Sequence, residues 1–286
     1  MNFEKYLIDK KNIIDHALDL FLPPEDKSPT NIHKAMRYSV FSGGKRFRPI
    51  LTLATAELLG KEIETVLNIA CGIELIHTFS LIHDDLPCID NDDFRRGKPS
   101  SHKVFGEAIA LLAGDALLVS GFELIAKNAE VKGVKKQSVL KAIKEISYYI
   151  GTNNMLGGQV EDICLENKDI TKEDLRNMYM KKTAALICVC IRVGAILSGA
   201  KQTQLKSLTK YAENIGLAFQ ITDDILDIMQ DQREMKKPTY PHIFGIKESK
   251  KEAEELILAA NDALKIFGHK AEIFNNLADY IVSREK

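Results

Sequence analysis

The chain has 286 residues, 45% of them hydrophobic, and a formal net charge of −1. It is long enough for one large core or two ordinary ones, and its balanced charge gives no general attraction to nucleic acid or to an anionic membrane. The five cysteines form no CxxC pair and are odd in number. This favours a reducing, cytoplasmic location over a disulfide-bonded secreted protein.

The N-terminal residues 1–21, MNFEKYLIDKKNIIDHALDLF, mix charged and apolar residues throughout. They lack the uninterrupted apolar segment and the small-residue cleavage site of a secretory signal peptide. We therefore expect the first helix of the folded chain here. A loop should follow it, because Pro23, Pro24 and Pro29 come next.

The next distinctive stretch is SGGKRFRPI, residues 42–50, in which two glycines precede three basic residues. Glycine lets the backbone approach an anion closely, and Pro49 suits the first turn of a helix, whose free amides favour negative charge. Arginine grips phosphate oxygens through two donors, and lysine serves as a point charge. The stretch therefore suits a phosphate site, although an ordinary surface turn would explain a lone GGK as well.

The stretch DDLPCIDNDD, residues 84–93, follows an apolar segment with helical spacing, IELIHTFSLIH. Carboxylates are unfavourable at the C-terminal end of a helix because of the macrodipole. Asp84, Asp85 and Asp90 therefore predict that something positive lies beside them. The ordinary alternative is a solvated helix end.

All eight prolines lie outside residues 100–237, and this gap favours long helices. Within the gap, apolar residues recur at helical spacing at Val139, Leu140, Ile143, Ile146 and Ile150. No segment shows a sustained alternation of apolar and polar residues. The sequence therefore predicts an all-α protein, organised as a single domain over residues 1–286.

Two further signals lie inside the proline gap. Thr171 stands three residues before Asp174, a pattern typical of a helix start. The longest apolar run, residues 184–200, holds Arg192 near its middle and is short for a membrane span. We expect it to form a buried helix, with Lys182 and Thr183 of YMKKTAAL near its beginning. Taken alone, these two residues, the KT pair, do not indicate a function.

The second acidic stretch is ITDDILDI, residues 221–228, in which Asp223 and Asp227 share a helix face with Gln220. Like charges four residues apart destabilise a bare helix, and the flanking residues are apolar. If this cluster faces the first one across a cavity, the two would hold cations that neither could hold alone. Oxygen ligands favour Mg2+, which takes one or two carboxylates plus waters and substrate phosphates, and this implies a phosphorylated substrate.

Together these motifs give the chain a clear resemblance to the trans-polyprenyl diphosphate synthases, above all to their bacterial farnesyl and plastid geranylgeranyl branches. The match runs from about residue 40 to the C-terminal LADYIVSREK. It rests on GGKRFRP (43–49), IHTFSLIHDDLPCIDNDDFRRGKPSSHKVFGE (76–107), LLAGDALL (111–118), GGQVEDI (157–163), KKTAAL (181–186), FQITDDILD (219–227) and KKPTYP (236–241). The resemblance implies an all-helical isoprenoid-synthase bundle with a deep central cavity, usually as a homodimer.

The resemblance also implies a reaction. It is the Mg2+-dependent condensation of isopentenyl diphosphate with dimethylallyl or geranyl diphosphate to give farnesyl diphosphate. The allylic C–O bond would break to leave a carbocation and diphosphate, the double bond of isopentenyl diphosphate would attack the cation, and the released diphosphate would take the proton. Lys182, Thr183 and Gln220 would line the cationic side of this step, with oxygen dipoles turned toward the cation.

Site residues follow from the same resemblance, position by position. The ligands of three Mg2+ ions would be Asp84, Asp85, Asp90, Asp223, Asp224 and Asp227. The allylic diphosphate would be held by Arg95, Lys182 and Lys237, with Lys236 as the alternative to the last. The diphosphate of isopentenyl diphosphate would be held by Lys45, Arg48, His77 and Arg96.

Phe79 is the expected determinant of product length. It lies five positions before Asp84, between one and two helical turns below the metals. In related short-chain synthases an aromatic residue here acts as a floor, which favours the fifteen-carbon farnesyl product. An ordinary core aromatic is the alternative.

The chain departs from the family pattern at one point, because only residues 228–238 separate the second acidic motif from TYP. Four other functions remain open. A geranylgeranyl diphosphate synthase would share every motif, and a class I terpene cyclase would not need the GGKRFRP pocket. A His-Asp phosphohydrolase would leave the second motif unexplained. A non-catalytic subunit of a heteromeric synthase would not need both acidic motifs intact.

Overall fold

The structure is a computed structural model that describes residues 2–165, 170–230 and 239–284. Its first elements are α1 (Phe3–Phe21), α2 (Thr30–Val40), α3 (Phe47–Leu58), η1 (Ile63–Thr65), α4 (Leu67–Asp84), β1 (Phe94–Arg95), β2 (Lys98–Pro99), α5 (Ser101–Phe105), α6 (Glu107–Lys127), η2 (Asn128–Glu130) and α7 (Lys136–Ile150). They are followed by α8 (Met155–Cys164), α9 (Lys172–Tyr179), η3 (Met180–Ala184), α10 (Ala185–Leu197), α11 (Gln202–Gln230), α12 (Tyr240–Phe244), α13 (Ile246–Ala263), η4 (Lys265–Ala271) and α14 (Glu272–Ser283). The predicted all-α fold is confirmed.

Internal contacts divide the chain into two compact units. The first holds the residues up to Glu57 together with Lys61–Ile143, and the second holds Leu58–Gly60 together with the residues from Lys144 onward. The first acidic stretch and the basic loop belong to the first unit. The KT pair and the second acidic stretch belong to the second. That the whole chain acts as a single domain stays a prediction.

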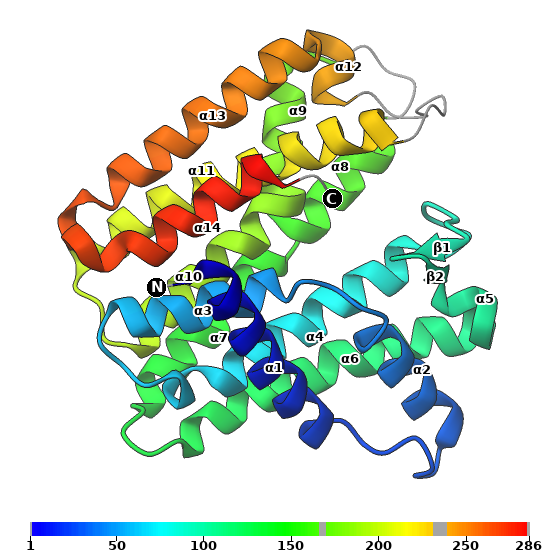
Figure 1. Ribbon diagram of the computed structural model, residues 1–286. Helices are drawn as coiled ribbons and strands as arrows, with labels where there is room; N and C mark the ends of the chain where they lie inside the picture. The colour runs from blue at the N-terminus through cyan, green and yellow to red at the C-terminus, as the bar shows by residue number, and fades with distance from the viewer. Residues whose placement is uncertain (1, 166–169, 231–238, 285–286) are drawn as a thin grey trace. The chain divides into compact units, whose positions relative to one another are not determined.

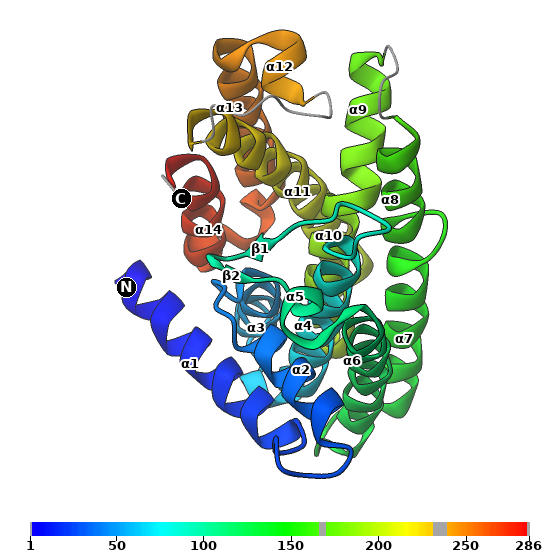
Figure 2. The same ribbon diagram turned by 90° about the vertical axis from the view of Figure 1, so that its right-hand side faces the viewer.

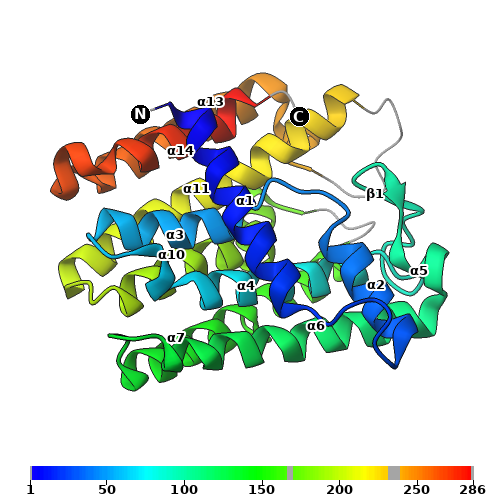
Figure 3. The ribbon, with the colours of Figure 1, turned by 60° about the horizontal axis from the view of Figure 1, so that its bottom comes forward.

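In the first unit, the main packing is between α4 and α6, which run side by side (Figure 3). The two helices cross closely at Gly72 and Gly121, where a Cβ on Gly72 would lie 2.7 Å from the carbonyl oxygen of Gly121. Ile69, Ile73 and Ile76 of α4 are fully buried. Because α4 is buried on nearly every side, its C-terminal end at Asp84 is held in a fixed position.

In the second unit, the 29-residue helix α11 is the central element. It packs against α10, α13 and α14 (Figure 1). Tyr211 of α11 is fully buried and donates a hydrogen bond of 2.6 Å to the backbone oxygen of Phe274 in α14. This packing fixes the orientation of the second acidic stretch, which lies near the end of α11.

Most sequence-based predictions of local structure are confirmed. The proline-marked loop follows α1, and Thr171 caps α9 in a reciprocal capping box with Asp174. The apolar run becomes α10, whose residues are nearly all buried. The prediction for α7 was wrong at Leu140, which is 60% exposed. The buried face runs instead through Val139, Ala142, Ile146 and Ile150, because positions three and four apart share a face and adjacent positions do not.

A short β-hairpin was not predicted. Figure 2 looks onto β1 and β2, which pair antiparallel with Arg95 opposite Lys98 and lead directly into α5. The two turn residues, Arg96 and Gly97, have φ of 54° and 76°, as the favoured two-residue hairpin turn requires. Two-residue strands are too short for an alternation of apolar and polar residues to reveal them. The hairpin sets the positions of Arg95 and Arg96.

A buried ion triad centred on Arg46 fixes the basic loop. The guanidinium is 2.7 Å from Asp15 of α1 and 2.9 Å from Glu74 of α4, and it donates to the Val40 carbonyl at 2.6 Å. The side chains of Arg46 and Glu74 are each only 2% exposed. Paired charges hold the pKa of Asp15 below its ordinary value although burial opposes this. Arg46 therefore anchors the stretch that carries Lys45.

We expect Arg46→Gln to lower the free energy of unfolding by about 3–5 kcal/mol, because removing one partner of a buried pair leaves the other charges uncompensated. Urea denaturation at neutral pH measures this loss. The control is Lys251→Gln, which removes an exposed pair with Glu255 and should change stability by less than about 1 kcal/mol. Equal effects of the two substitutions would contradict the anchoring role of Arg46.

Candidate active site

The first acidic stretch begins where α4 ends. Asp84 is the last residue of α4, and its carbonyl accepts a hydrogen bond of 2.9 Å from the backbone N–H of Asp90. This bond closes the intervening turn and brings the first and last aspartates of the motif together. Both residues are partly exposed. Their carboxylates therefore lie at the surface of one short loop.

Asp85 has a different environment, because it is buried and paired with Arg95 of β1. The Nε of Arg95 is 2.9 Å from Asp85 Oδ1, and its Nη2 is 3.1 Å from Asp92 Oδ2. Burial raises the pKa of Asp85, while the Arg95 pair acts in the opposite direction. The sequence predicted a positive group beside the acidic stretch, and Arg95 of this chain is one such group.

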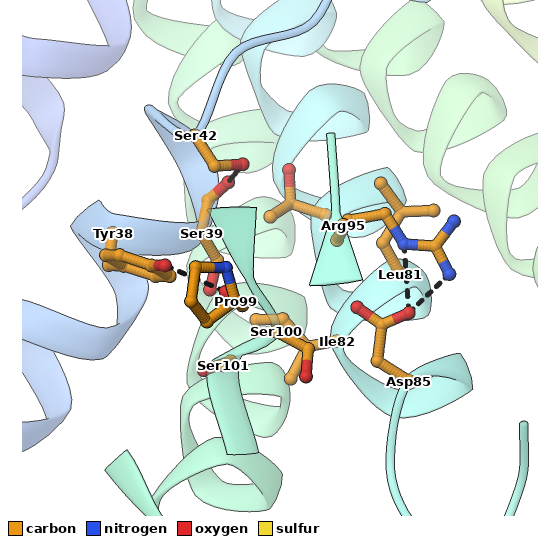
Figure 4. A pocket seen from close by; sticks show the side chains of 11 residues that line it. Tyr38, Ser39, Ser42, Leu81, Ile82, Asp85, Arg95, Pro99, Ser100 and Ser101 are labelled. Atoms are coloured by element: carbon orange, nitrogen blue, oxygen red, sulfur yellow. Dashed lines mark hydrogen bonds and ion pairs between the residues drawn. The ribbon is translucent and has the colours of Figure 1, made fainter. Parts of the chain in front are cut away.

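A small pocket links the acidic stretch to the basic loop (Figure 4). Ser42, at the start of the basic loop, lies on one side, and the Asp85–Arg95 pair lies on the other. Tyr38 donates a hydrogen bond of 2.8 Å to the carbonyl of Pro99. The lining residues are Tyr38, Ser39, Ser42, Thr78, Leu81, Ile82, Asp85, Arg95, Pro99, Ser100 and Ser101. The first unit therefore brings the basic loop and the motif of residues 76–107 together around one pocket.

The residues predicted to hold isopentenyl diphosphate are also brought together in the first unit. Arg96 donates a hydrogen bond of 2.7 Å to the carbonyl of Gly43. Its guanidinium lies against Gly44, where a Cβ would be 2.7 Å from Arg96 Cζ. Lys45 follows directly and is exposed. Gly43 and Gly44 have φ of 116° and 109°, which explains the need for glycine at both positions.

Arg48 and His77 form the other part of this basic cluster. Arg48 Nη1 lies 3.3 Å from His77 Nε2. Burial and, next, the charge of Arg48 hold the pKa of His77 well below its ordinary value. The imidazole is therefore neutral and accepts from Arg48 at Nε2, which leaves the positive charge on the arginine.

In the second unit, the two neighbouring aspartates of α11 have opposite environments. Asp223 Oδ1 accepts a hydrogen bond of 2.5 Å from Arg284, near the C-terminus, and the guanidinium of Arg284 also stacks 4.1 Å from the Phe219 ring centroid. Asp224 is only 4% exposed. It accepts from Tyr179 Oη, from Gln220 Nε2 at 2.9 Å and from the backbone N–H of Tyr240 at 3.2 Å. Asp227, one turn after Asp223, is exposed.

The resemblance implied that Asp224 is a metal ligand, but in the structure its side chain is buried among protein donors. Burial raises its pKa to about 6, although the hydrogen bonds from Tyr179 and Gln220 act in the opposite direction. Both of its oxygens already serve protein donors. Asp223 and Asp227 are more exposed, so they are better placed to meet a ligand.

The KT pair lies in a π-helical turn, η3, between α9 and α10. Lys182 Nζ is 2.6 Å from Asp162 of α8, and Thr183 Oγ1 is 2.6 Å from Gln220 Oε1 of α11. Short π-helical segments often occur at functional sites. The second unit therefore joins α8, η3 and α11 into one polar cluster next to Asp223.

Phe79 is 7% exposed, and its ring packs edge-on against His83 at a centroid distance of 4.7 Å. His83 Nε2 lies 3.1 Å from the carbonyl of Leu111 in α6. A Cβ on Gly114 would lie 2.3 Å from His83 Nε2. His83 therefore braces Phe79 against α6, and it fits only because residue 114 is glycine.

Two of the predicted site residues, Lys236 and Lys237, lie outside the described residues. Among those that the structure describes, no three His, Cys, Asp or Glu side chains lie together in a way that could hold a metal ion. The donor set nevertheless fits Mg2+, because this ion takes one or two protein carboxylates and completes its shell with waters and substrate phosphates. Asp84 with Asp90, and Asp223 with Asp227, each offer such a pair of oxygen donors.

Sequence reasoning missed Arg46, Asp162, Tyr179 and Arg284. Asp162 lies in GGQVEDI, which the resemblance identified without giving the residue a role. A helical repeat could have shown that Asp224 is buried, because Asp224 follows Leu217 by seven positions and Ile221 by three. No local pattern pointed to Arg284 or Tyr179, which meet the second motif from distant parts of the chain.

Comparison with known proteins places the chain in a family. The polyprenyl synthetase family model matches residues 29–273. The chain is 42% identical over 294 residues to a geranylgeranyl diphosphate synthase of Cyanophora paradoxa, covering 99% of this chain and 97% of that protein. It is 42% identical over 294 residues to a dimethylallyltranstransferase of Fischerella ambigua, covering 99% and 84%.

A solved structure agrees with these relatives. The crystal structure of an FPP/GFPP synthase from Zymomonas mobilis superimposes with a TM-score of 0.90 at 34% identity, covering 99% of each chain. The chain therefore belongs to the polyprenyl synthetase family, and it is a prenyltransferase of the prenyl diphosphate synthase type.

Proposed function

We propose that this prenyltransferase makes farnesyl diphosphate from isopentenyl diphosphate and dimethylallyl or geranyl diphosphate, with Mg2+. The buried ring of Phe79 carries the choice of product. It lies on α4 between one and two turns before Asp84 and is held in place by His83. An allylic chain that grows down α4 from the metal end would meet this ring, and a rigid aromatic residue stops growth better than a flexible one.

The protein groups have distinct tasks in the proposed reaction. Lys45, Arg48, His77 and Arg96 bind and orient the diphosphate of isopentenyl diphosphate, while Arg95 and Lys182 bind the allylic diphosphate. Fixed cationic donors lower the barrier because they stabilise the negative charge that develops as the allylic C–O bond breaks. Thr183 and Gln220 would turn oxygen atoms toward the carbocation, from which water must be excluded because it would trap the cation.

Mg2+ would be held by Asp84, Asp90, Asp223 and Asp227 together with substrate phosphates. Asp85 and Asp224, the other two predicted ligands, are instead buried and accept hydrogen bonds from Arg95 and Gln220. When bound, Mg2+ supplies Lewis-acid stabilisation of the diphosphate leaving group. That both acidic motifs act on one cluster of ions stays a prediction. Their oxygen-only donors and their neighbouring cations, Arg95 and Arg284, support it.

Geranylgeranyl diphosphate synthesis is the second candidate, because several similar proteins carry that name. The experiment is incubation of the purified chain with Mg2+, labelled isopentenyl diphosphate and dimethylallyl, geranyl or farnesyl diphosphate in turn, followed by sizing of the dephosphorylated products. A fifteen-carbon alcohol that EDTA abolishes supports the proposal. A twenty-carbon alcohol favours the second candidate, and no elongation from any primer favours a non-catalytic subunit.

Phe79→Ala is expected to shift the main product from fifteen to twenty or more carbons, because it removes the ring that blocks the growing chain. Product sizing by chromatography measures the shift. Leu75→Ala is the matched control, since Leu75 is fully buried one turn earlier on α4. It should cost about 2–5 kcal/mol of stability without changing product length. An unchanged product from Phe79→Ala would place the floor elsewhere.

We also propose that the protein acts as a cytoplasmic homodimer. Residues 107–130, which include α6, are long and apolar enough to cross a membrane by length and composition alone. The exposed side chains of this helix include Leu111, Leu112 and Val119, at 44%, 50% and 69%, and an apolar face of this kind suits a subunit interface. All five cysteines are free thiols, which suits a reducing compartment. Light scattering should give twice the chain mass of 32.0 kDa.

A further inference from the structure

The carboxylate of Asp224 sits at the centre of a hydrogen-bond network inside the second unit. Tyr179 and the backbone N–H of Tyr240 donate to Oδ2, and Gln220 Nε2 donates to Oδ1 at 2.9 Å. Gln220 Oε1 in turn lies 2.6 Å from Thr183 Oγ1. The network therefore connects Asp224 to Thr183 through a single amide.

The chemistry of these groups fixes the direction of every hydrogen bond. An amide oxygen cannot donate, so the hydroxyl of Thr183 must donate its one hydrogen to Gln220 Oε1. The Gln220 amide has this orientation because its NH2 group faces Asp224, which as a carboxylate can only accept. With its hydrogen used in this way, Thr183 can present only acceptor lone pairs to anything else that approaches its oxygen.

We propose that Asp224 is a positioning residue and not a metal ligand: with Tyr179 it orients Gln220, and through Gln220 it turns the lone pairs of Thr183 toward the allylic carbocation. This inference rests on the proposed function. It assigns the second acidic motif two tasks. Asp223 and Asp227 face the ligand, and Asp224 faces the protein.

Metal ligation by Asp224 would disrupt this network. An ion at Oδ2 would displace Tyr179 or the backbone N–H of Tyr240, and leaving a buried donor unpaired costs about 1–3 kcal/mol. An ion at Oδ1 would have to share that oxygen with Gln220 in a side chain that is only 4% exposed. Tyr179 also ends α9 directly before η3, and Thr183 lies within η3. The same carboxylate thus holds the start of the π-helical turn and, through Gln220, the hydroxyl of Thr183 within that turn.

Asp224→Asn is the decisive variant, because the structure predicts that it reverses the network. The backbone N–H of Tyr240 needs an acceptor, so the new side chain must place its oxygen there and its NH2 group toward Gln220. The Gln220 amide must then flip, and its NH2 group would face Thr183. Thr183 would become an acceptor and turn its hydrogen outward, toward the cation.

We expect Asp224→Asn to lower kcat about 100-fold and Tyr179→Phe to lower it about tenfold, as is usual for groups that orient a reacting residue. KM for both substrates should stay within about twofold of the wild type, because ground-state binding is unchanged. Mn2+ affinity and stoichiometry, measured by electron paramagnetic resonance, should also stay unchanged. Asp223→Asn is the comparison variant and should weaken Mn2+ binding.

The double variant Gln220→Glu/Asp224→Asn tests the direction of the network. The carboxylate introduced at position 220 would accept both from the new NH2 group at position 224 and from the hydroxyl of Thr183, which restores Thr183 as a donor. We expect kcat at least tenfold higher than that of Asp224→Asn alone. A double variant no faster than the single one would overturn the proposed direction.

Metal ligation by Asp224 predicts the opposite set of results. Asp224→Asn would then weaken Mn2+ binding as much as Asp223→Asn does, and Tyr179→Phe would retain the wild-type rate; either result overturns the proposal. If Asp224→Asn does not fold, the rate of Tyr179→Phe decides. A wild-type chain that elongates no primer would refute the proposed function instead, and the Mn2+ titration would still decide the role of Asp224.

Discussion

Asp84→Asn should lower the turnover number for chain elongation by about 10³-fold, because Asp84 is a proposed ligand of the Mg2+ that would neutralise the departing diphosphate. The fold should be unaffected. Asp84 is the last residue of α4 and is partly exposed, and a negative charge at a helix C-terminus is unfavourable. Stability should therefore stay equal or rise slightly. A loss of rate without a loss of stability is the expected pattern for a residue selected for binding a cation.

The measurement is the steady-state rate of elongation as a function of Mg2+ concentration. Asp84→Asn should raise the Mg2+ concentration needed for half-maximal rate as well as lowering the maximum. The matched control is Asp93→Asn from the same acidic stretch, since Asp93 pairs with Lys103 and its side chain is 62% exposed. Its rate and Mg2+ requirement should equal those of the wild type. Identical behaviour of the two variants would remove Asp84 from the list of ligands.

Local signals in the sequence were sufficient to predict the all-α fold and the places of several helices. Thr171 indicated the start of α9 because a cap acts only on the residues next to it. The positive partner of the first motif was predicted from the helix dipole alone, and the structure provides Arg95. These predictions succeeded because their physical causes operate over a few residues.

The partners that divide the tasks within the second motif could not be predicted in the same way. Asp223 and Asp224 are chemically identical neighbours, but consecutive residues of a helix point about 100° apart, so their side chains leave α11 in different directions. What separates them is set by distant residues: Arg284 is 61 positions from Asp223, and Tyr179 is 45 positions from Asp224. The helical repeat of apolar residues indicates which aspartate is buried, but it does not indicate these partners, which tertiary packing brings to the motif.

Arg46 shows a related difficulty. In GGKRFRP it is one of three basic residues, and composition alone suggests that all three face an anion. In the structure it turns inward with φ of 53° and pairs with Asp15 and Glu74. Its acidic partners lie 31 and 28 positions away. Nothing near the motif could have distinguished this anchor from its neighbours.

Gly158→Ala is expected to lower turnover about 100-fold, because it displaces the KT pair from the rest of the site. The Cβ of alanine would lie 2.4 Å from the backbone nitrogen of Lys182 and 2.7 Å from its Cα. Neither atom can rotate away, so α8 and η3 must separate by about 1 Å to regain normal contact distance. A misplacement of this size can cost about 10²-fold in rate. The Lys182–Asp162 pair, at 2.6 Å, spans the same contact.

The measurement is kcat together with the melting temperature of the variant. Overpacking should cost about 1–3 kcal/mol of stability, so the protein should remain folded at assay temperature while losing rate. Val160→Ala is the control on the same helix, since Val160 is 59% exposed and alanine favours helix. A Gly158→Ala variant with wild-type rate would show that the position of η3 does not limit the reaction.

The opposite side of η3 is packed just as closely, against α11. Gly216 of α11 faces Ala184, and a Cβ there would lie 2.6 Å from Ala184 Cβ and 2.7 Å from its Cα. The π-helical turn is thus packed between two glycines, one on α8 and one on α11. Gly216→Ala should push η3 away from α11 and stretch the bond from Thr183 to Gln220. Because the two substitutions displace η3 from opposite sides, a loss of rate in both would show that the reaction depends on the position of this turn.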